Sequence, residues 1–153
     1  MATKLLIDAD ACPVIDIAIS VSYQFQIETI LFCDTSHQIE RKGVQTIVVP
    51  KGPDSVDFKL VNATNKNDIV ITQDYGLAAM CLAKGAVTVD QNGREMNSEN
   101  IDQLLSFRYE SVKIRRSGGR TRGPKKRTQE NNHAFEKSFR AICERLKKQE
   151  EEL

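Results

Sequence analysis

The stretch LLIDADACPV, residues 5–14, joins a short apolar run to two aspartates, Asp8 and Asp10. Side chains two positions apart on an extended segment lie on the same side, so these carboxylates are expected close together. Two like charges held close repel each other unless a positive group lies between them. The stretch therefore predicts a strand of a sheet and, where that strand ends, a place for a cation.

Short apolar runs alternate with amphipathic stretches over the first 90 residues, which is typical of beta-alpha units and a mainly parallel sheet. Proline and glycine mark the boundaries: Pro13 is expected to open the first helix, and Gly85 to end a later one. The predicted strands are 4–7, 28–32, 45–49, 69–71 and 86–89. The predicted helices begin at Pro13, span 55–63 and 75–83, and follow an N-cap at Asn97 or Ser98.

The net charge of +1 hides an uneven distribution along the chain. Residues 1–107 carry eight Lys and Arg against fourteen Asp and Glu, whereas residues 108–127 carry nine against one. Residues 128–153 are nearly balanced, with five against six. An acidic body joined to one basic segment indicates a metal on one surface and phosphate groups on another.

Three parts of one domain are expected from this distribution. Residues 1–110 form the α/β body, and residues 111–130 form a basic, glycine-rich loop that includes SGGRTRGPKKRT. Residues 131–153 form a C-terminal helix that packs on the body, because their apolar side chains recur at helical spacing. Those side chains are Phe135, Phe139, Ile142, Cys143 and Leu146.

The chain carries none of the signals of a membrane or disulfide-rich protein. At 153 residues it is long enough for one core, and no stretch approaches the roughly 18 apolar residues of a membrane helix. We therefore expect a cytoplasmic protein without membrane contact. Its four cysteines are far apart and form no C-x-x-C pair, which favours reduced core thiols. His37 and His133 are not at metal-ligand spacing and are expected to be ordinary polar residues.

Three aspartates are placed where parallel sheets bind ligands, beyond the carboxyl ends of the strands. Asp8 ends the first strand, Asp74 follows another in DIVITQDYGLA, and Asp57 lies in the first turn of the helix after Gly52 and Pro53. If the two strands are neighbours, the carboxylates meet. All-oxygen sites of this kind suit Mg²⁺ or Mn²⁺.

Each aspartate also has a purely structural interpretation. Asp74 is a good N-cap, Asp57 is favoured in a first turn by the helix dipole, and Asp10 can serve the helix after Pro13. Asp8 has no obvious cap to make, which favours a functional role. The glycine-rich SGGRTRG is not a P-loop, because no strand precedes it and no Lys-Ser/Thr follows.

Three motifs resemble the YaiI/YqxD family of bacterial proteins, which is itself similar to the PIN-domain nucleases. They are DADACPV at 8–14, VITQDYGLA at 70–78 and GGRTRGP at 118–124, the last followed by a helix that bears phenylalanine. The resemblance covers nearly the whole chain. It implies a PIN-like, three-layer α/β/α sandwich whose carboxylates bind Mg²⁺ or Mn²⁺ and cut RNA.

The resemblance also assigns site residues. Asp8 matches the first PIN aspartate, Asp74 matches the aspartate of a threonine-x-aspartate motif, and Asp57 is the best match to the middle acid.

The chain departs from the PIN pattern after this motif. Where many PIN nucleases carry a further acid or asparagine, it has Tyr75 and Gly76. A fourth carboxylate must then come from Asp10, Asp54 or Asp90.

Our leading hypothesis is a metal-dependent phosphodiesterase acting on RNA. Asp8, Asp57 and Asp74 would hold one or two ions. Asp10 would be a fourth ligand or would support the ligands without contacting the ion. The basic segment would contact phosphates without reading sequence. Its expected nucleic-acid-binding residues are Arg115, Arg116, Arg120, Arg122, Lys125, Lys126 and Arg127.

Two other functions remain open from the sequence. One is a nucleic-acid or ribosome-associated binding module that keeps the fold without chemistry. The other is a haloacid-dehalogenase-like phosphatase, with Asp8 as nucleophile and Asp10 as acid and base. Against it, Cys12 replaces the residue expected two after Asp10, and no later paired-aspartate motif follows. The sequence leaves the oligomeric state and the substrate open.

Overall fold

A computed structural model describes residues 2–106 and 126–152 of the chain. In chain order the elements are β1 (Lys4–Asp8), α1 (Ile15–Gln24), β2 (Glu28–Asp34), β3 (Gln45–Val49), α2 (Ser55–Ala63), β4 (Ile69–Ile71), α3 (Tyr75–Ala83), β5 (Val87–Val89), β6 (Glu95–Met96) and α5 (Gln129–Glu151). Residues 101–106 are also helical. None of the described helices is long and apolar enough to span a membrane.

The strands form one six-stranded sheet in the order β3-β2-β1-β4-β5-β6. Every neighbouring pair is parallel except β5 and β6. From β1 the chain first builds outward to β2 and β3, and it then crosses to β4 on the other side of β1. The strand order therefore reverses between β1 and β4, the position at which open α/β sheets bind ligands.

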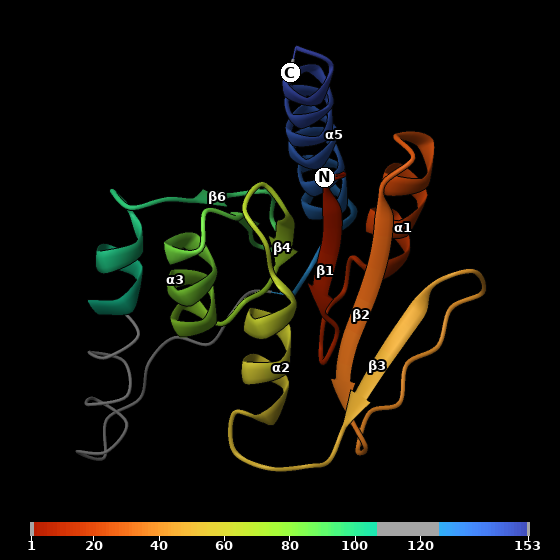
Figure 1. The fold of residues 1–153 in the computed structure, drawn as a ribbon, viewed down its shortest axis with the longest axis vertical. Helices are drawn as coiled ribbons and strands as arrows, with labels where there is room; N and C mark the ends of the chain where they lie inside the picture. The colour runs from red at the N-terminus through yellow and green to blue at the C-terminus, as the bar shows by residue number, and fades with distance from the viewer. Residues whose placement is uncertain (1, 107–125, 153) are drawn as a thin grey trace.

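Helices cover both faces of the sheet and give the three layers of an α/β/α sandwich (Figure 1). On one face, Leu5 and Ile7 of β1 belong to the core that α1 and α5 complete. On the other face, Leu6 packs in a second core with α2 and α3, including Leu60 and Leu77. Both faces of β1 are thus apolar, as a buried parallel strand requires.

Most of the predicted elements are confirmed. β3, β4, α2 and α3 have the expected bounds, and Asn97 caps the helix at 101–106 through hydrogen bonds from the amides of Glu99 and Asn100. The predicted start of the first helix was wrong. α1 begins at Ile15, with Val14 at its N-cap, because residues 11–14 form turns after the strand.

Strand β6 was missed by the sequence analysis. It has two residues and pairs antiparallel with β5. A run this short cannot show the alternation of apolar and polar residues by which a strand is recognised.

Helix α5 returns the end of the chain to the sheet. Thr128 and Asn131 form a capping box at its start, and Phe135 and Phe139 stack in the core with ring centroids 5.4 Å apart. Near its end, the Glu150 carboxylate accepts the amide of Thr3 at 2.7 Å. Figure 1 shows α5 beside α1 and the N-terminus.

The turn between β5 and β6 is fixed against the first half of α5. The Asp90 carboxylate accepts the amides of Asn92 and Arg94, which closes the turn. Gly93 has φ of 85°, and a Cβ built there would lie 2.8 Å from the Ser138 Cβ and 2.9 Å from the Ala134 carbonyl oxygen. Only glycine fits this close approach of turn and helix.

We predict that Gly93→Ala destabilises the protein more than Gly43→Ala does. Gly43 also has a positive φ, 77°, but nothing lies within 4 Å of its added Cβ. Both variants pay the left-handed backbone cost of about 1 kcal/mol, and only Gly93→Ala adds the clash with the α5 backbone, about 1 to 3 kcal/mol more. Urea unfolding of both variants measures the difference. Equal losses would show that the turn does not press on α5.

Candidate functional site

The candidate site begins where β1 and β4 end side by side. In the register of this pair, Leu5, Leu6 and Ile7 lie opposite Ile69, Val70 and Ile71. The next residues, Asp8 and Thr72, therefore leave the sheet together at its carboxyl edge. The sequence predicts that the carboxylates meet if the strands before Asp8 and Asp74 are neighbours, and the pairing of β1 with β4 confirms that they are.

Thr72 connects the two aspartates at this edge. Its hydroxyl donates to the Asp8 carboxylate at 2.9 Å, and the same hydroxyl oxygen accepts the amide of Asp74 at 3.0 Å. Thr72 is itself 1% exposed, so the bridge is held inside the protein. The threonine of the threonine-x-aspartate motif thus orients Asp8 and fixes the chain where Asp74 begins.

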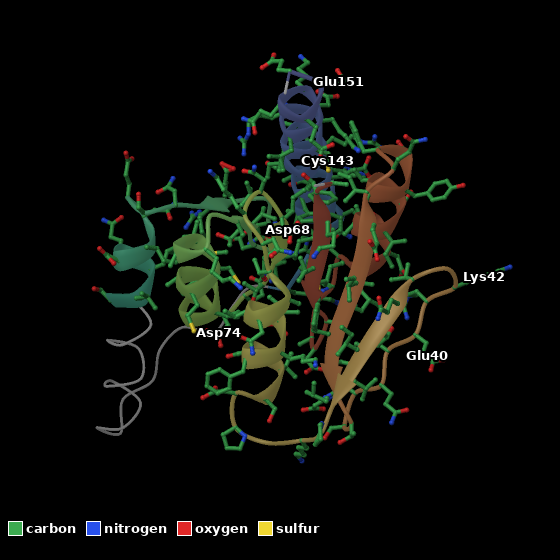
Figure 2. All side chains as sticks on the ribbon, in the orientation of Figure 1. Glu40, Lys42, Asp68, Asp74, Cys143 and Glu151 are labelled. Atoms are coloured by element: carbon green, nitrogen blue, oxygen red, sulfur yellow. The ribbon has the colours of Figure 1, made fainter. Side chains whose placement is uncertain are left out.

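Asp74 caps α3. Its Oδ1 accepts the amides of Gly76 and Leu77 at 2.9 and 3.1 Å, which confirms the structural interpretation of this residue. Figure 2 shows Asp74 at the end of α3 nearest the carboxyl edge, while Asp68 lies at the opposite end of β4. The cap does not remove the charge of Asp74 from the edge, because that charge still acts on Asp8.

Asp57 approaches the same place from α2. It lies in the first turn of that helix, as the sequence predicts, and it is half-buried. Among the neighbouring carboxylates it acts most strongly on Asp8, followed by Asp10 and Asp74. The three aspartates that match the PIN pattern are therefore brought together, each from a different element.

The surroundings of Asp8 raise its pKa from the ordinary 3.8 to about 6. Burial is the largest cause, because it disfavours the charged form, and the negative charges of Asp57, Asp10 and Asp74 add to it. The hydrogen bond from Thr72 acts in the opposite direction. At Asp8 the unfavourable effects of burial and of the neighbouring charges therefore outweigh the hydrogen bond from Thr72.

Asp10 faces a different neighbour from the one expected. Its Oδ1 lies 3.6 Å from His37 Nδ1, and the same nitrogen lies 3.7 Å from Asp34 Oδ1. The expectation that Asp10 serves the first helix was wrong, because no side chain caps α1. Ala11 adopts a left-handed φ of 57°, which turns the chain directly after Asp10.

Sequence reasoning missed Asp34 and treated His37 as an ordinary polar residue. The signal for Asp34 was present, since it ends the buried run TILFCD just as Asp8 ends the first strand. Nothing in the spacing pointed to His37, because the turn after β2 brings it back toward Asp10.

Of the other two acids considered for a fourth position, Asp90 has a local role. Asp90 is 7% exposed and closes the β5–β6 turn. Asp54 precedes α2 with a left-handed φ of 58° and makes no side-chain cap.

Most of the predicted nucleic-acid-binding residues lie outside the described residues: Arg115, Arg116, Arg120, Arg122 and Lys125. Lys126 is exposed. The Arg127 guanidinium donates to Asn132 Oδ1, Asn92 Oδ1 and the Gln91 carbonyl at 2.7, 3.0 and 2.7 Å, so it anchors the start of α5. Phosphate binding by these residues stays a prediction.

The donor groups around Asp8 are carboxylate and hydroxyl oxygens, which suit a hard cation. They are not closed into a tight cage. Within residues 2–106 and 126–152, the one group of three possible ligand atoms within 4.8 Å of one another is Asp10, Asp34 and His37. A Mg²⁺ or Mn²⁺ ion beside Asp8 would therefore use few protein ligands and keep several waters, as Mg²⁺ commonly does.

Comparisons with known proteins identify relatives over most of the chain. A family model described as "Uncharacterized BCR, YaiI/YqxD family" matches residues 6–145. A "UPF0178 protein" of Exiguobacterium sibiricum is 52% identical over 136 residues, 89% of this chain and 93% of that protein. One of Clostridium acetobutylicum is 40% identical over 146 residues, 94% of this chain and 99% of that protein. No solved structure matches the chain.

We predict that Asp8→Asn stabilises the metal-free protein at pH 7.5 and not at pH 3.5. Because the folded-state pKa is raised from 3.8 to about 6, ionisation of Asp8 costs stability as the pH rises through this window. The amide carries no charge and escapes that cost, at most about 3 kcal/mol at about 1.4 kcal/mol per pKa unit. Urea unfolding in EDTA at both pH values measures the effect.

The exposed Glu144 of α5 provides the control. Glu144→Gln should change stability little at either pH. An Asp8→Asn variant no more stable than the wild type at pH 7.5 would contradict the assigned environment of Asp8.

Proposed function

The chain belongs to the YaiI/YqxD family, and we propose that it is a metal-dependent phosphodiesterase that cleaves RNA. The observation that carries the proposal is the convergence of Asp8, Asp57 and Asp74 at the point where the strand order reverses. Carboxylates gathered in this way, with a strongly raised pKa on one of them, are typical of functional sites. The same arrangement is costly for a protein that uses it only for folding.

Mg²⁺ or Mn²⁺ is the cation that fits the proposal. Asp8 would be the main ligand, because Thr72 fixes one of its oxygens and it lies nearest the reversal of strand order. Asp57 and Asp74 would contribute a second ligand or bind the ion's waters. A bound divalent ion would supply an activated water and stabilise negative charge on the attacked phosphate.

The protein's own groups have separate parts in this proposal. Asp8 loses its proton near pH 6, so above that pH it offers a charged oxygen to the ion. Thr72 holds that carboxylate in one orientation, and the cap formed by Asp74 fixes the start of α3 against it. The basic segment at 108–127, nine Lys and Arg against one Glu, would hold the RNA backbone.

We predict that Asp74→Asn abolishes Mn²⁺-dependent cleavage of single-stranded RNA and leaves RNA affinity unchanged or slightly higher. Asparagine caps helices as well as aspartate does, so α3 should persist. The lost charge would weaken binding of the ion, while one fewer negative group would face the phosphates. Cleavage of an end-labelled RNA and filter binding measure the two effects.

Glu144→Gln changes α5, on the face of the sheet opposite α2 and α3, and should cleave RNA like the wild type. EDTA should stop cleavage by the wild type and by this variant. Equal cleavage by Asp74→Asn and wild type would identify a contaminating nuclease and contradict the proposal. Binding without cleavage by either protein, over varied RNAs, would favour the binding module instead.

We predict that RNA binding weakens steeply with salt because of the basic segment. The logarithm of the affinity should fall by about 0.7 per phosphate contacted for each tenfold rise in salt. The slope should flatten when four basic residues are changed to Gln: Arg120, Arg122, Lys125 and Lys126.

The control removes the same charge from four exposed lysines elsewhere: Lys42, Lys66, Lys137 and Lys148. Its salt slope should stay close to that of the wild type. If both variants keep the wild-type slope, the segment does not hold the RNA.

A further inference from the structure

A second group of possible ligands lies at the carboxyl ends of β1 and β2. Asp10 lies two residues beyond β1, and Asp34 is the last residue of β2. His37 follows in a tight turn, in which Asp34 Oδ1 accepts the Ser36 amide at 2.8 Å and the Asp34 carbonyl accepts the His37 amide at 3.2 Å. The turn carries the imidazole back over the strand end.

The three side chains face one point. His37 Nδ1 lies 3.6 Å from Asp10 Oδ1 and 3.7 Å from Asp34 Oδ1, and one ligand atom of each residue lies within 4.8 Å of the others. Ligand atoms in a tetrahedral zinc site lie about 3.3 Å apart, given bonds of about 2 Å. Small side-chain movements would therefore close these atoms around an ion.

One atom of the group lacks a hydrogen-bond partner. The Asp10 side chain is 27% exposed, and its carboxylate accepts a hydrogen bond from the Asp34 backbone, but its Oδ1 atom is buried and accepts no hydrogen bond from the described residues. A buried carboxylate oxygen left in this way is costly. Its nearest positive candidate, the His37 nitrogen at 3.6 Å, is too distant for a good hydrogen bond.

A protonated His37 is the simplest alternative occupant of this point. It would place one positive charge between two carboxylates. However, Asp34 Oδ1 already accepts the Ser36 amide, and both distances from Nδ1 exceed those of ordinary hydrogen bonds, so the histidine does not satisfy the Asp10 oxygen. A divalent cation can bind all three atoms at once, including the buried Asp10 oxygen.

We propose that Asp10, Asp34 and His37 form a binding site for a divalent transition-metal ion of the Zn²⁺ class. One imidazole nitrogen among two carboxylate oxygens suits Zn²⁺ and its neighbours better than Mg²⁺ or Ca²⁺. The His37 side chain is 66% exposed, so the ion would exchange with solvent and keep open coordination positions. This site adjoins the Asp8 group, since the Asp10 charge acts on Asp8, but it has its own three ligands and does not rest on the proposed RNA cleavage.

The chain's histidine content makes a direct test available. His37 and His133 are the two histidines of the sequence, and His133 lies exposed on α5. Zn²⁺ titrated into the ¹⁵N-labelled full chain should shift the His37 ring nitrogens and leave those of His133 in place. Calorimetry on the same samples measures the affinity.

Asp34→Asn and Asp10→Asn should each weaken zinc binding at His37 by at least about tenfold. Even the loss of a residue that only hydrogen-bonds to a metal ligand commonly costs that much affinity. Asp57→Asn, which alters the other group, should leave the His37 shift unchanged. Circular dichroism checks that Asp10→Asn and Asp34→Asn are folded. If one of them misfolds, the other still tests the proposal.

Three results would overturn the proposal. They are no shift of His37 at 1 mM Zn²⁺, wild-type zinc affinity at His37 in both Asp10→Asn and Asp34→Asn, or zinc binding that survives His37→Ala unchanged. The last would mean that zinc binds elsewhere on the chain.

Discussion

The parallel pairing of β1 with β4 is the contact on which the rest of the structure depends. It joins residues 64 positions apart, and the strand residues that make it are fully buried on both faces. Because β2 and β3 lie on one side of β1 while β4 and β5 lie on the other, the connections leave the two strand ends in opposite directions. Asp8 and Thr72 therefore meet where no crossover helix separates them.

Negative charge at this edge opposes folding while it prepares a site. Burial and three neighbouring carboxylates raise the pKa of Asp8, and the Thr72 hydroxyl offsets part of that cost. A second group, built on Asp10, continues the acidic edge toward β2. An arrangement that lowers the stability of a protein at one edge of its sheet commonly marks a ligand-binding site. The buried cores on both faces of the sheet provide the stability against which this cost is set.

Local patterns in the sequence were enough for most of the fold. The apolar residues of QTIVV, 45–49, stand between the clear breaks at Gly43 and Pro50, which is enough to find β3. Gly52 and Pro53 precede α2, and α3 is framed by the capping Asp74 and by Gly85. The meeting of Asp8 with Asp74 followed from a general rule for parallel sheets. The His37 contact did not, because it depends on the path of one turn. The two-residue β6 is too short for its pattern to show, and the start of α1 depends on the turns that follow β1.

Anomalous diffraction from crystals grown with Mn²⁺ tests the central claim most directly, because it locates the ion without reference to activity. The account predicts a peak within coordination distance of the Asp8 carboxylate, on the side of Asp57 and Asp74. Well-ordered crystals at millimolar Mn²⁺ with no peak beside Asp8 would contradict it.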